Sequence, residues 1–160
     1  MTLRVGDPAP DFTLRDQHGR RRSRASAHGR RPLVLVFFPF AFSGVCTGEL
    51  RELREQTGRI EEAGADLVAV SCDPMFAMRV FADQDGLEFP LLSDFWPHGE
   101  VASAYDAFDS EHGCPTRSTF VIDAEGIVRW SVHNAMGEAR SVDDYVHALE
   151  AISASGSPTR

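Results

Sequence analysis

The first half of the chain alternates a continuous apolar run with helical spacing. Residues 33–38 are all apolar, as expected for a central strand buried on both faces. From about Thr47, apolar and half-apolar side chains recur every three or four residues as far as Ile60, which predicts one face of a helix. Gly64 is a suitable end for that helix. The pattern therefore predicts a buried strand that leads directly into an amphipathic helix.

The pattern then repeats, with a second buried strand at 67–71 and a helix capped by Asp73 and begun by Pro74. The remaining predicted elements are a hairpin with strands at 12–14 and 20–23, a strand at 89–93, a short helix at 98–105, strands at 118–122 and 126–132, and a closing helix at 142–152. This order predicts an α/β thioredoxin-like fold, with a central mixed sheet flanked by helices, an N-terminal β-hairpin addition and a central insertion.

Length and composition fit one ordinary domain. We expect a single domain over 1–153 and a flexible tail over 154–160, because the tail is small and polar. No apolar run approaches the ~20 residues of a membrane span, and the N-terminus lacks the apolar stretch of a secretory signal. We therefore expect a cytoplasmic protein that does not enter membranes.

Charge is unevenly distributed in this chain, whose net charge is −8. Residues 1–31 carry eight Arg against three Asp, and the run 20–24 contains four of these Arg. Such a run would suit nucleic acid or a membrane surface. However, no aromatic residue is interleaved with it and the whole chain is acidic, so we expect a solvated hairpin and no nucleic-acid partner.

The cysteines indicate reactive chemistry rather than a scaffold. The three residues, Cys46, Cys72 and Cys114, form no CxxC pair and no zinc pattern. A disulfide framework is not expected in a chain of this size and apolar content. The histidines have no ligand spacing with a carboxylate, so we expect no metal site.

Cys46 lies where the predicted strand meets the predicted helix. The free backbone N–H groups of Val45 and Cys46 and the helix dipole favour a thiolate there, and these donors would stabilise negative charge that develops on a bound oxygen atom. Ser43 stands where thioredoxins have the first cysteine of CxxC, so dithiol exchange is not possible from this motif. Pro39 and Phe42 would shield the thiol from bulk water.

The segment Pro39-x-x-x-Ser43-x-x-Cys46 resembles the active-site motif of the peroxiredoxins. Residues 9–12 resemble the N-terminal segment of that family, and 117–123 resemble the strand that carries its active-site arginine. Residues 89–99 resemble the one-cysteine alkyl hydroperoxide reductase E subgroup in particular. The resemblance covers about residues 5–152 and implies a thiol-dependent peroxidase that needs no cofactor.

The resemblance also implies roles for single residues. Cys46 would attack hydrogen peroxide or an organic hydroperoxide and become a sulfenic acid, with Arg117 stabilising the charge that develops. Ser43 would orient the peroxide, Pro39 would exclude water, and Val45 and Phe42 would line the substrate site. Glu49 either orients the arginine or is an ordinary acid near the helix N-terminus.

The thiol that regenerates Cys46 is less constrained. Position 51, where some relatives have a resolving cysteine, is Arg51, and the chain lacks a C-terminal cysteine. An external thiol, of the mycothiol/mycoredoxin or thioredoxin type, is therefore favoured. As an alternative, Cys114 would resolve the sulfenic acid from a loop next to Arg117, with His112 helping to ionise it.

Other readings stay open at this point. Slow turnover with every reductant would indicate a peroxide sensor or holdase. A Cys46 thiol with an ordinary pKa would indicate a thioredoxin-fold scaffold with an incidental cysteine. Cys72, at the end of a buried strand, is expected to be a core residue. A homodimer or higher homo-oligomer is also expected, with four aromatic candidates for the contact: Phe40, Phe42, Phe95 and Trp96.

Overall fold

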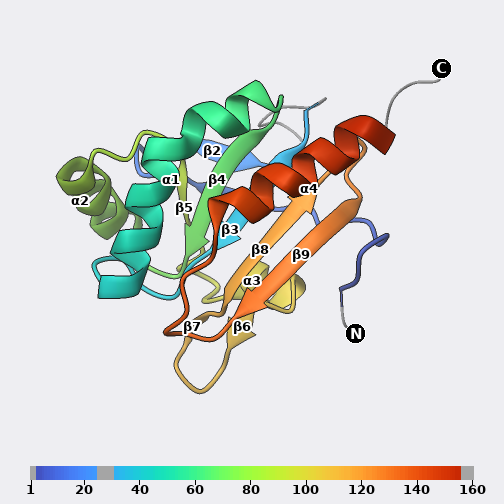
Figure 1. Cartoon of the computed structure of the whole chain (residues 1–160). Helices are drawn as coiled ribbons and strands as arrows, with labels where there is room; N and C mark the ends of the chain where they lie inside the picture. Colours follow the sequence, from blue (N-terminus) through green and yellow to red (C-terminus); the bar gives the residue numbers. More distant parts are fainter. Residues whose placement is uncertain (1–2, 25–30, 156–160) are drawn as a thin grey trace.

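The computed structural model describes residues 3–24 and 31–155, and its strands and helices alternate along most of the chain (Figure 1). In chain order the elements are β1 (Thr13–Arg15), β2 (Arg21–Ser23), β3 (Leu33–Phe37), α1 (Gly44–Glu62), β4 (Asp66–Ser71), α2 (Met75–Asp85), β5 (Leu91–Ser93), α3 (Glu100–Ala104), β6 (Phe108–Asp109), β7 (Cys114–Pro115), β8 (Arg117–Ile122), β9 (Val128–Asn134) and α4 (Val142–Ser155).

Within the described residues, seven strands form one mixed sheet in the order β2-β1-β5-β4-β3-β8-β9. The central strands β3, β4 and β5 are parallel, whereas β8 pairs antiparallel with β3, and β9 with β8. Because parallel strands point the same way, the carboxyl ends of β3, β4 and β5 meet at one edge of the sheet. Ligand sites of open α/β sheets are found at such an edge.

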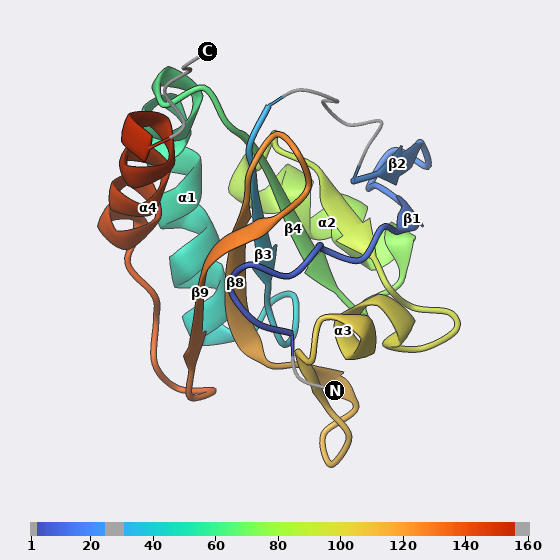
Figure 2. The ribbon, with the colours of Figure 1, turned by 90° about the vertical axis from the view of Figure 1, so that its right-hand side faces the viewer.

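The two faces of the sheet bury separate cores because side chains alternate along each strand. On β3, Val34 and Val36 pack in the cluster that includes buried residues of α1, α2 and α4. Leu33, Leu35 and Phe37 pack on the other face, with α3 and the N-terminal segment. Figure 2 shows α1 and α4 on one side of the sheet and α3 on the other.

The predicted fold class is confirmed, including the N-terminal hairpin. This hairpin is not a separate appendage, because β1 pairs with β5 through Arg15 and Ser93 and so extends the central sheet. The pair β6–β7 was not predicted. It contains two residues in each strand, too few for an alternating pattern to be seen in the sequence.

Several predicted boundaries are wrong. Helix α1 begins at Gly44, three residues before the predicted start. Asp73 does not cap α2, because its carboxylate accepts hydrogen bonds from the Ala41 amide and the Ser71 hydroxyl instead. Helix α4 continues to Ser155, so 154 and 155 are helical where a tail was expected. The rest of that predicted tail, 156–160, lies outside the described residues.

Gly99, which precedes α3, is required by its surroundings. Its φ is +73°, and an added Cβ would lie 2.3 Å from a ring carbon of Phe108. We expect Gly99→Ala to lower the free energy of unfolding by about 2 kcal/mol through backbone strain and overlap. The matched control is Gly58→Ala inside α1, where a Cβ meets nothing within 4 Å. That variant should gain about 0.5–1 kcal/mol. Urea denaturation measures both, and equal effects would contradict this account.

Candidate active site

The loop between β3 and α1 is held in a tight, partly strained conformation. The Ala41 amide donates to Asp73 Oδ2 at 2.8 Å, and Ser43 Oγ donates to the Phe40 carbonyl at 2.9 Å. Phe42 has a φ of +71°, which an L side chain rarely adopts. Its ring packs at 5.1 Å from that of Phe81 on α2 while remaining half exposed. Strain of this kind persists where the surroundings fix it, commonly at functional sites.

Cys46 lies in the first turn of α1 and is fully buried. The first amide that bonds within the helix is that of Thr47, which donates to the Ser43 carbonyl at 2.8 Å. The amides of Gly44, Val45 and Cys46 therefore precede the intrahelical hydrogen bonds and give this end its partial positive charge. No acidic residue lies in this first turn to offset that charge. The helix end thus presents a partial positive charge beside Cys46.

Arg117 is the buried first residue of β8, and its guanidinium lies near enough to Cys46 to interact with the charge of its sulfur. It also donates to Glu49 Oε1 at 2.5 Å and, through Nε, to the Met136 carbonyl at 2.9 Å. Burial lowers the pKa of Arg117, but the negative charges of Cys46 and Glu49 outweigh that effect and raise it. The cation is therefore fixed beside the thiol.

Glu49 lies one turn beyond Cys46 and binds two arginines. Arg140 donates to Glu49 Oε2 through its backbone N at 2.6 Å and through Nε at 2.9 Å, and to Oε1 through Nη2 at 2.8 Å. Burial raises the pKa of Glu49, but the hydrogen bonds and charges of Arg140, with the charge of Arg117, hold it below its usual value. Glu49 is therefore hydrogen-bonded to two buried guanidiniums, in addition to lying near the N-terminus of α1.

Arg140 was not predicted as a site residue from the sequence. Its Nη1 donates to the carbonyls of Phe37 and Ser118 at 2.8 and 2.7 Å, so it joins the ends of β3 and β8 below the site. It is one of many Arg in the chain, and 91 residues separate it from Glu49. No spacing rule connects residues so far apart, so a single sequence holds no signal for it.

The other predicted residues lie around this centre. Pro39 is buried just after β3, Val45 is half-buried in the first turn of α1, and Ser43 is the N-cap of that helix. The Ser43 hydroxyl makes no capping hydrogen bond to the helix, since it donates to Phe40. Its oxygen lone pairs remain available as acceptors.

Cys114 was predicted to lie in a loop, and this prediction is wrong. It lies in strand β7, where it pairs in register with Asp109 and is fully buried. Burial, together with the charges of Asp109 and Cys46, raises the pKa of the Cys114 thiol to about 11. His112 hydrogen-bonds Asp109 Oδ2 at 2.8 Å rather than assisting this thiol. Cys72 is buried as expected, and burial raises the pKa of its thiol to about 12.

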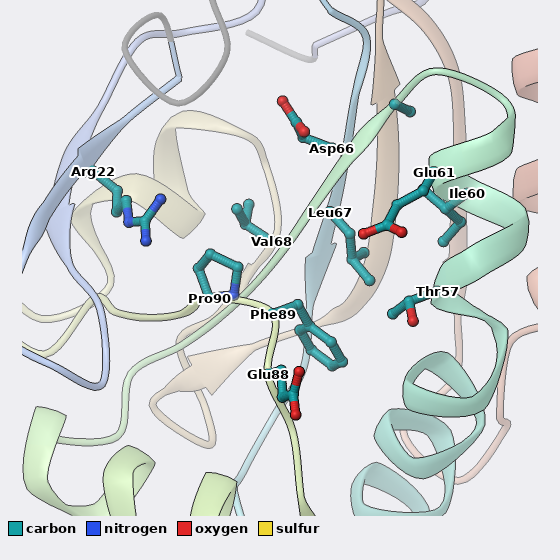
Figure 3. Close-up of a pocket in the computed structure, with 11 residues that line it drawn as sticks. Arg22, Thr57, Ile60, Glu61, Asp66, Leu67, Val68, Glu88, Phe89 and Pro90 are labelled. Carbon is teal, nitrogen blue, oxygen red and sulfur yellow. The ribbon is translucent and has the colours of Figure 1, made fainter.

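A cavity of about 360 Å³ near the far end of α1 is not part of this site (Figure 3). Thr57 and Glu61 of α1 line it together with Glu88 and Phe89. Thr57 is eleven residues from Cys46 along one helix, a distance of about 16 Å. Among the described residues, no group of three or more His, Cys, Asp or Glu could hold a metal ion. In that same part of the chain, no helix is long and apolar enough to span a membrane.

A buried cysteine at a helix N-terminus, with a fixed arginine beside its sulfur, is the arrangement of a thiol peroxidase. Residues 5–131 match the profile of the AhpC/TSA family, and the chain belongs to this family of peroxiredoxins. It is therefore an enzyme that reduces peroxides with thiols.

Several individual proteins of this family are similar to the chain. The chain is 43% identical over 152 residues to alkyl hydroperoxide reductase E of Mycobacterium tuberculosis, covering 95% of this chain and 99% of that protein. Its fold matches the crystal structure of the peroxidoxin BcpB of the same organism with a TM-score of 0.84 and 32% identity, over 94% and 98% of the two chains. Enterococcus faecalis AhpC matches with a TM-score of 0.87 and 26% identity, over 100% of this chain and 99% of that one. In sequence, the chain thus resembles alkyl hydroperoxide reductase E over almost its whole length.

Proposed function

We propose that Cys46 is the peroxidatic residue of a one-cysteine peroxidase. Its thiolate attacks the terminal oxygen of the peroxide, the O–O bond breaks, and the hydroxide or alkoxide that leaves takes up a proton to give water or an alcohol. Cys46 is left as a sulfenic acid. The observation that carries this proposal is the buried guanidinium of Arg117, which is hydrogen-bonded to Glu49 and interacts with the charge of Cys46.

The surrounding groups divide the remaining tasks. Arg117 and the amides of Val45 and Cys46 stabilise the negative charge that develops on the oxygens. Ser43 orients the peroxide, while Pro39 excludes water. The ring of Phe42 lines the entrance, which suits organic and fatty-acid hydroperoxides as well as hydrogen peroxide and peroxynitrite.

We propose that an external thiol, of the mycothiol/mycoredoxin or thioredoxin type, regenerates Cys46. With a pKa of about 11, only about one Cys114 thiol in ten thousand is ionised at pH 7. The thiolate is the attacking species, so Cys114 in the folded chain is expected to react only slowly with the sulfenic acid of Cys46. A two-cysteine cycle through Cys114 is the second candidate, because the charges of Cys46 and Cys114 interact.

The setting of the enzyme is also a proposal. One catalytic domain extends to the end of α4 at Ser155, and the three free thiols suit the reducing cytoplasm. A homodimer would cover the exposed aromatic side chains near the site, which are 42–80% exposed: Phe40, Phe42, Phe95 and Trp96.

The test is a stopped-flow reaction of the reduced protein with one equivalent of hydrogen peroxide, followed by intact mass and a thiol count. We expect a reaction far faster than that of free cysteine, one added oxygen atom, and two of the three thiols remaining. Cys114→Ser should give the same rate and the same sulfenic acid. A bridge that leaves one thiol in the wild type and disappears in Cys114→Ser would establish the two-cysteine cycle instead.

A further inference from the structure

Two arginines stand directly opposite each other in the N-terminal hairpin. Arg15 of β1 and Arg21 of β2 are an in-register antiparallel pair, and both side chains are exposed. Like charges at opposed positions destabilise a hairpin. Among the described residues neither forms an ion pair, and Arg15 donates only to the Gly19 carbonyl. Arg22, by contrast, pairs with Asp16 at 3.0 Å. The opposed pair therefore lacks the anion that would stabilise it.

These two arginines line a cavity of about 620 Å³, here called the arginine pocket. Its apolar wall is formed by Phe76 of α2 and by Phe95 and Trp96, which follow β5. The three aromatic side chains are 69%, 48% and 80% exposed, respectively. None of the described residues that line the pocket is acidic, although the chain as a whole is acidic. The cavity of Figure 3 has the opposite character, since carboxylates line it.

The start of α2 adds to the positive potential of the arginine pocket. Pro74, the N-cap, lines the pocket and offers no side-chain hydrogen bond to the helix. The Met78 amide is the first to donate within the helix, to the Pro74 carbonyl at 3.1 Å, so the amides of the preceding turn are not engaged in it. This helix end therefore reinforces the two guanidiniums in attracting an anion.

The pocket also lies at the edge of the sheet where ligands are expected. Pro74 follows the carboxyl end of β4 and Phe95 follows that of β5, the edge at which Cys46 follows β3. The strand β5 is two positions from β3 in the sheet, so it lies about 10 Å away from it. The arginine pocket is therefore a neighbour of the Cys46 site and separate from it.

We propose that the arginine pocket binds an aromatic carboxylate. The two guanidiniums match the geometry of a carboxylate, and their repulsion is relieved when one anion bridges them. The aromatic ring of such a ligand packs against Phe76, Phe95 and Trp96. This contact contributes more binding free energy than burial of apolar surface alone, because aromatic rings also attract one another. A pocket of this size accommodates such a small molecule.

A second copy of the chain is the competing occupant, because Phe95 and Trp96 also belong to the surface proposed for the homodimer. A neighbouring chain seated there would block small molecules from the arginine pocket as the protein concentration rises. The ligand, in contrast, needs only the hairpin, α2 and the segment after β5 of one chain. The affinity at concentrations below and above dimerisation therefore separates the two occupants.

The test titrates the full chain with 2-naphthoate and follows the two tryptophan indole N–H signals by NMR. We expect a saturable shift of the Trp96 signal and no shift of Trp130, which packs against Tyr145. Arg15→Gln combined with Arg21→Gln should weaken binding about tenfold. The matched control is Arg20→Gln, which removes a charge from the same hairpin outside the pocket and should bind as the wild type does. The neutral 2-naphthalenemethanol should bind the wild type as weakly as naphthoate binds the double variant.

Three results would overturn the proposal: no saturable Trp96 shift, equal binding of naphthoate and the alcohol, or loss of binding as the chain dimerises. A second measurement does not depend on a ligand. Arg21→Gln alone should leave the thermal midpoint unchanged or raise it, and a clear drop would mean that the pair is structural. Cys46→Ser should bind naphthoate normally, so failure of the peroxidase proposal and failure of this one are distinguishable.

Discussion

Cys46→Ser abolishes the fast reaction with hydrogen peroxide and leaves the fold intact. A serine hydroxyl fits the same buried position but cannot accept an oxygen from the peroxide as sulfur does. Only Cys72 and Cys114 then remain, and burial raises the pKa of each thiol to about 12 and about 11. We therefore expect the rate constant to fall by about a thousandfold or more.

Stopped-flow mixing with peroxide measures this loss, and urea denaturation verifies that the variant is folded. Cys72→Ser is the matched control, since it removes another buried thiol from the end of β4 and should retain the wild-type rate. A folded Cys46→Ser protein that still reacted quickly would place the peroxidatic thiol elsewhere.

Glu49→Gln has the second large effect, on stability and on rate together. The carboxylate is buried between Arg117 and Arg140, so its loss leaves two buried cations without their anion. Breaking such a pair costs about 3–5 kcal/mol of the free energy of unfolding. Arg117 also loses one of the contacts that hold it against Cys46, and a small displacement of a catalytic group lowers the rate about a hundredfold.

The effect of Glu49→Gln depends on pH in a defined direction. Because the folded protein lowers the pKa of Glu49, its ionised form contributes stability above the unfolded value of 4.5, and that contribution is lost as the pH falls through the folded value. The difference in unfolding free energy between wild type and variant should therefore be largest above pH 4.5 and shrink in acid. Glu52→Gln, on the exposed face of the same helix, should show neither loss. A difference that grew in acid would contradict this role for Glu49.

Much of the fold was predictable because its elements have strong local patterns. The run 33–38 has no polar interruption, and the helix after it has clear periodicity, so both were identified and their junction at Cys46 with them. The start of α1 was placed late because the first turn, Gly44–Cys46, includes a glycine and only one side chain, that of Cys46, in phase with the apolar positions Leu50 and Leu53. Asp73 was misjudged because Asp before Pro is a common helix start, whereas tertiary contacts with Ala41 prevail here.

The active site was predictable only in part, for a similar physical reason. Cys46 has a local context, and Arg117 was found through the motif around it. The contacts from Glu49 to Arg117 and Arg140 span 68 and 91 residues, and such contacts exist only once β3, β8 and α1 are packed together. The strand position of Cys114 was missed because two residues carry no periodicity.

The carboxylate of Asp73 connects two regions that the sequence keeps apart. This carboxylate accepts a hydrogen bond from the amide of Ala41 in the Cys46 loop. The residue Asp73 itself immediately precedes Pro74, which is the N-cap of α2 and lines the arginine pocket. The Cys46 loop and the start of α2 are therefore joined through Asp73. A displacement of either segment is expected to displace the other. A protein engineer who wished to alter peroxide reactivity could work from Asp73, leaving every residue that touches the sulfur in place.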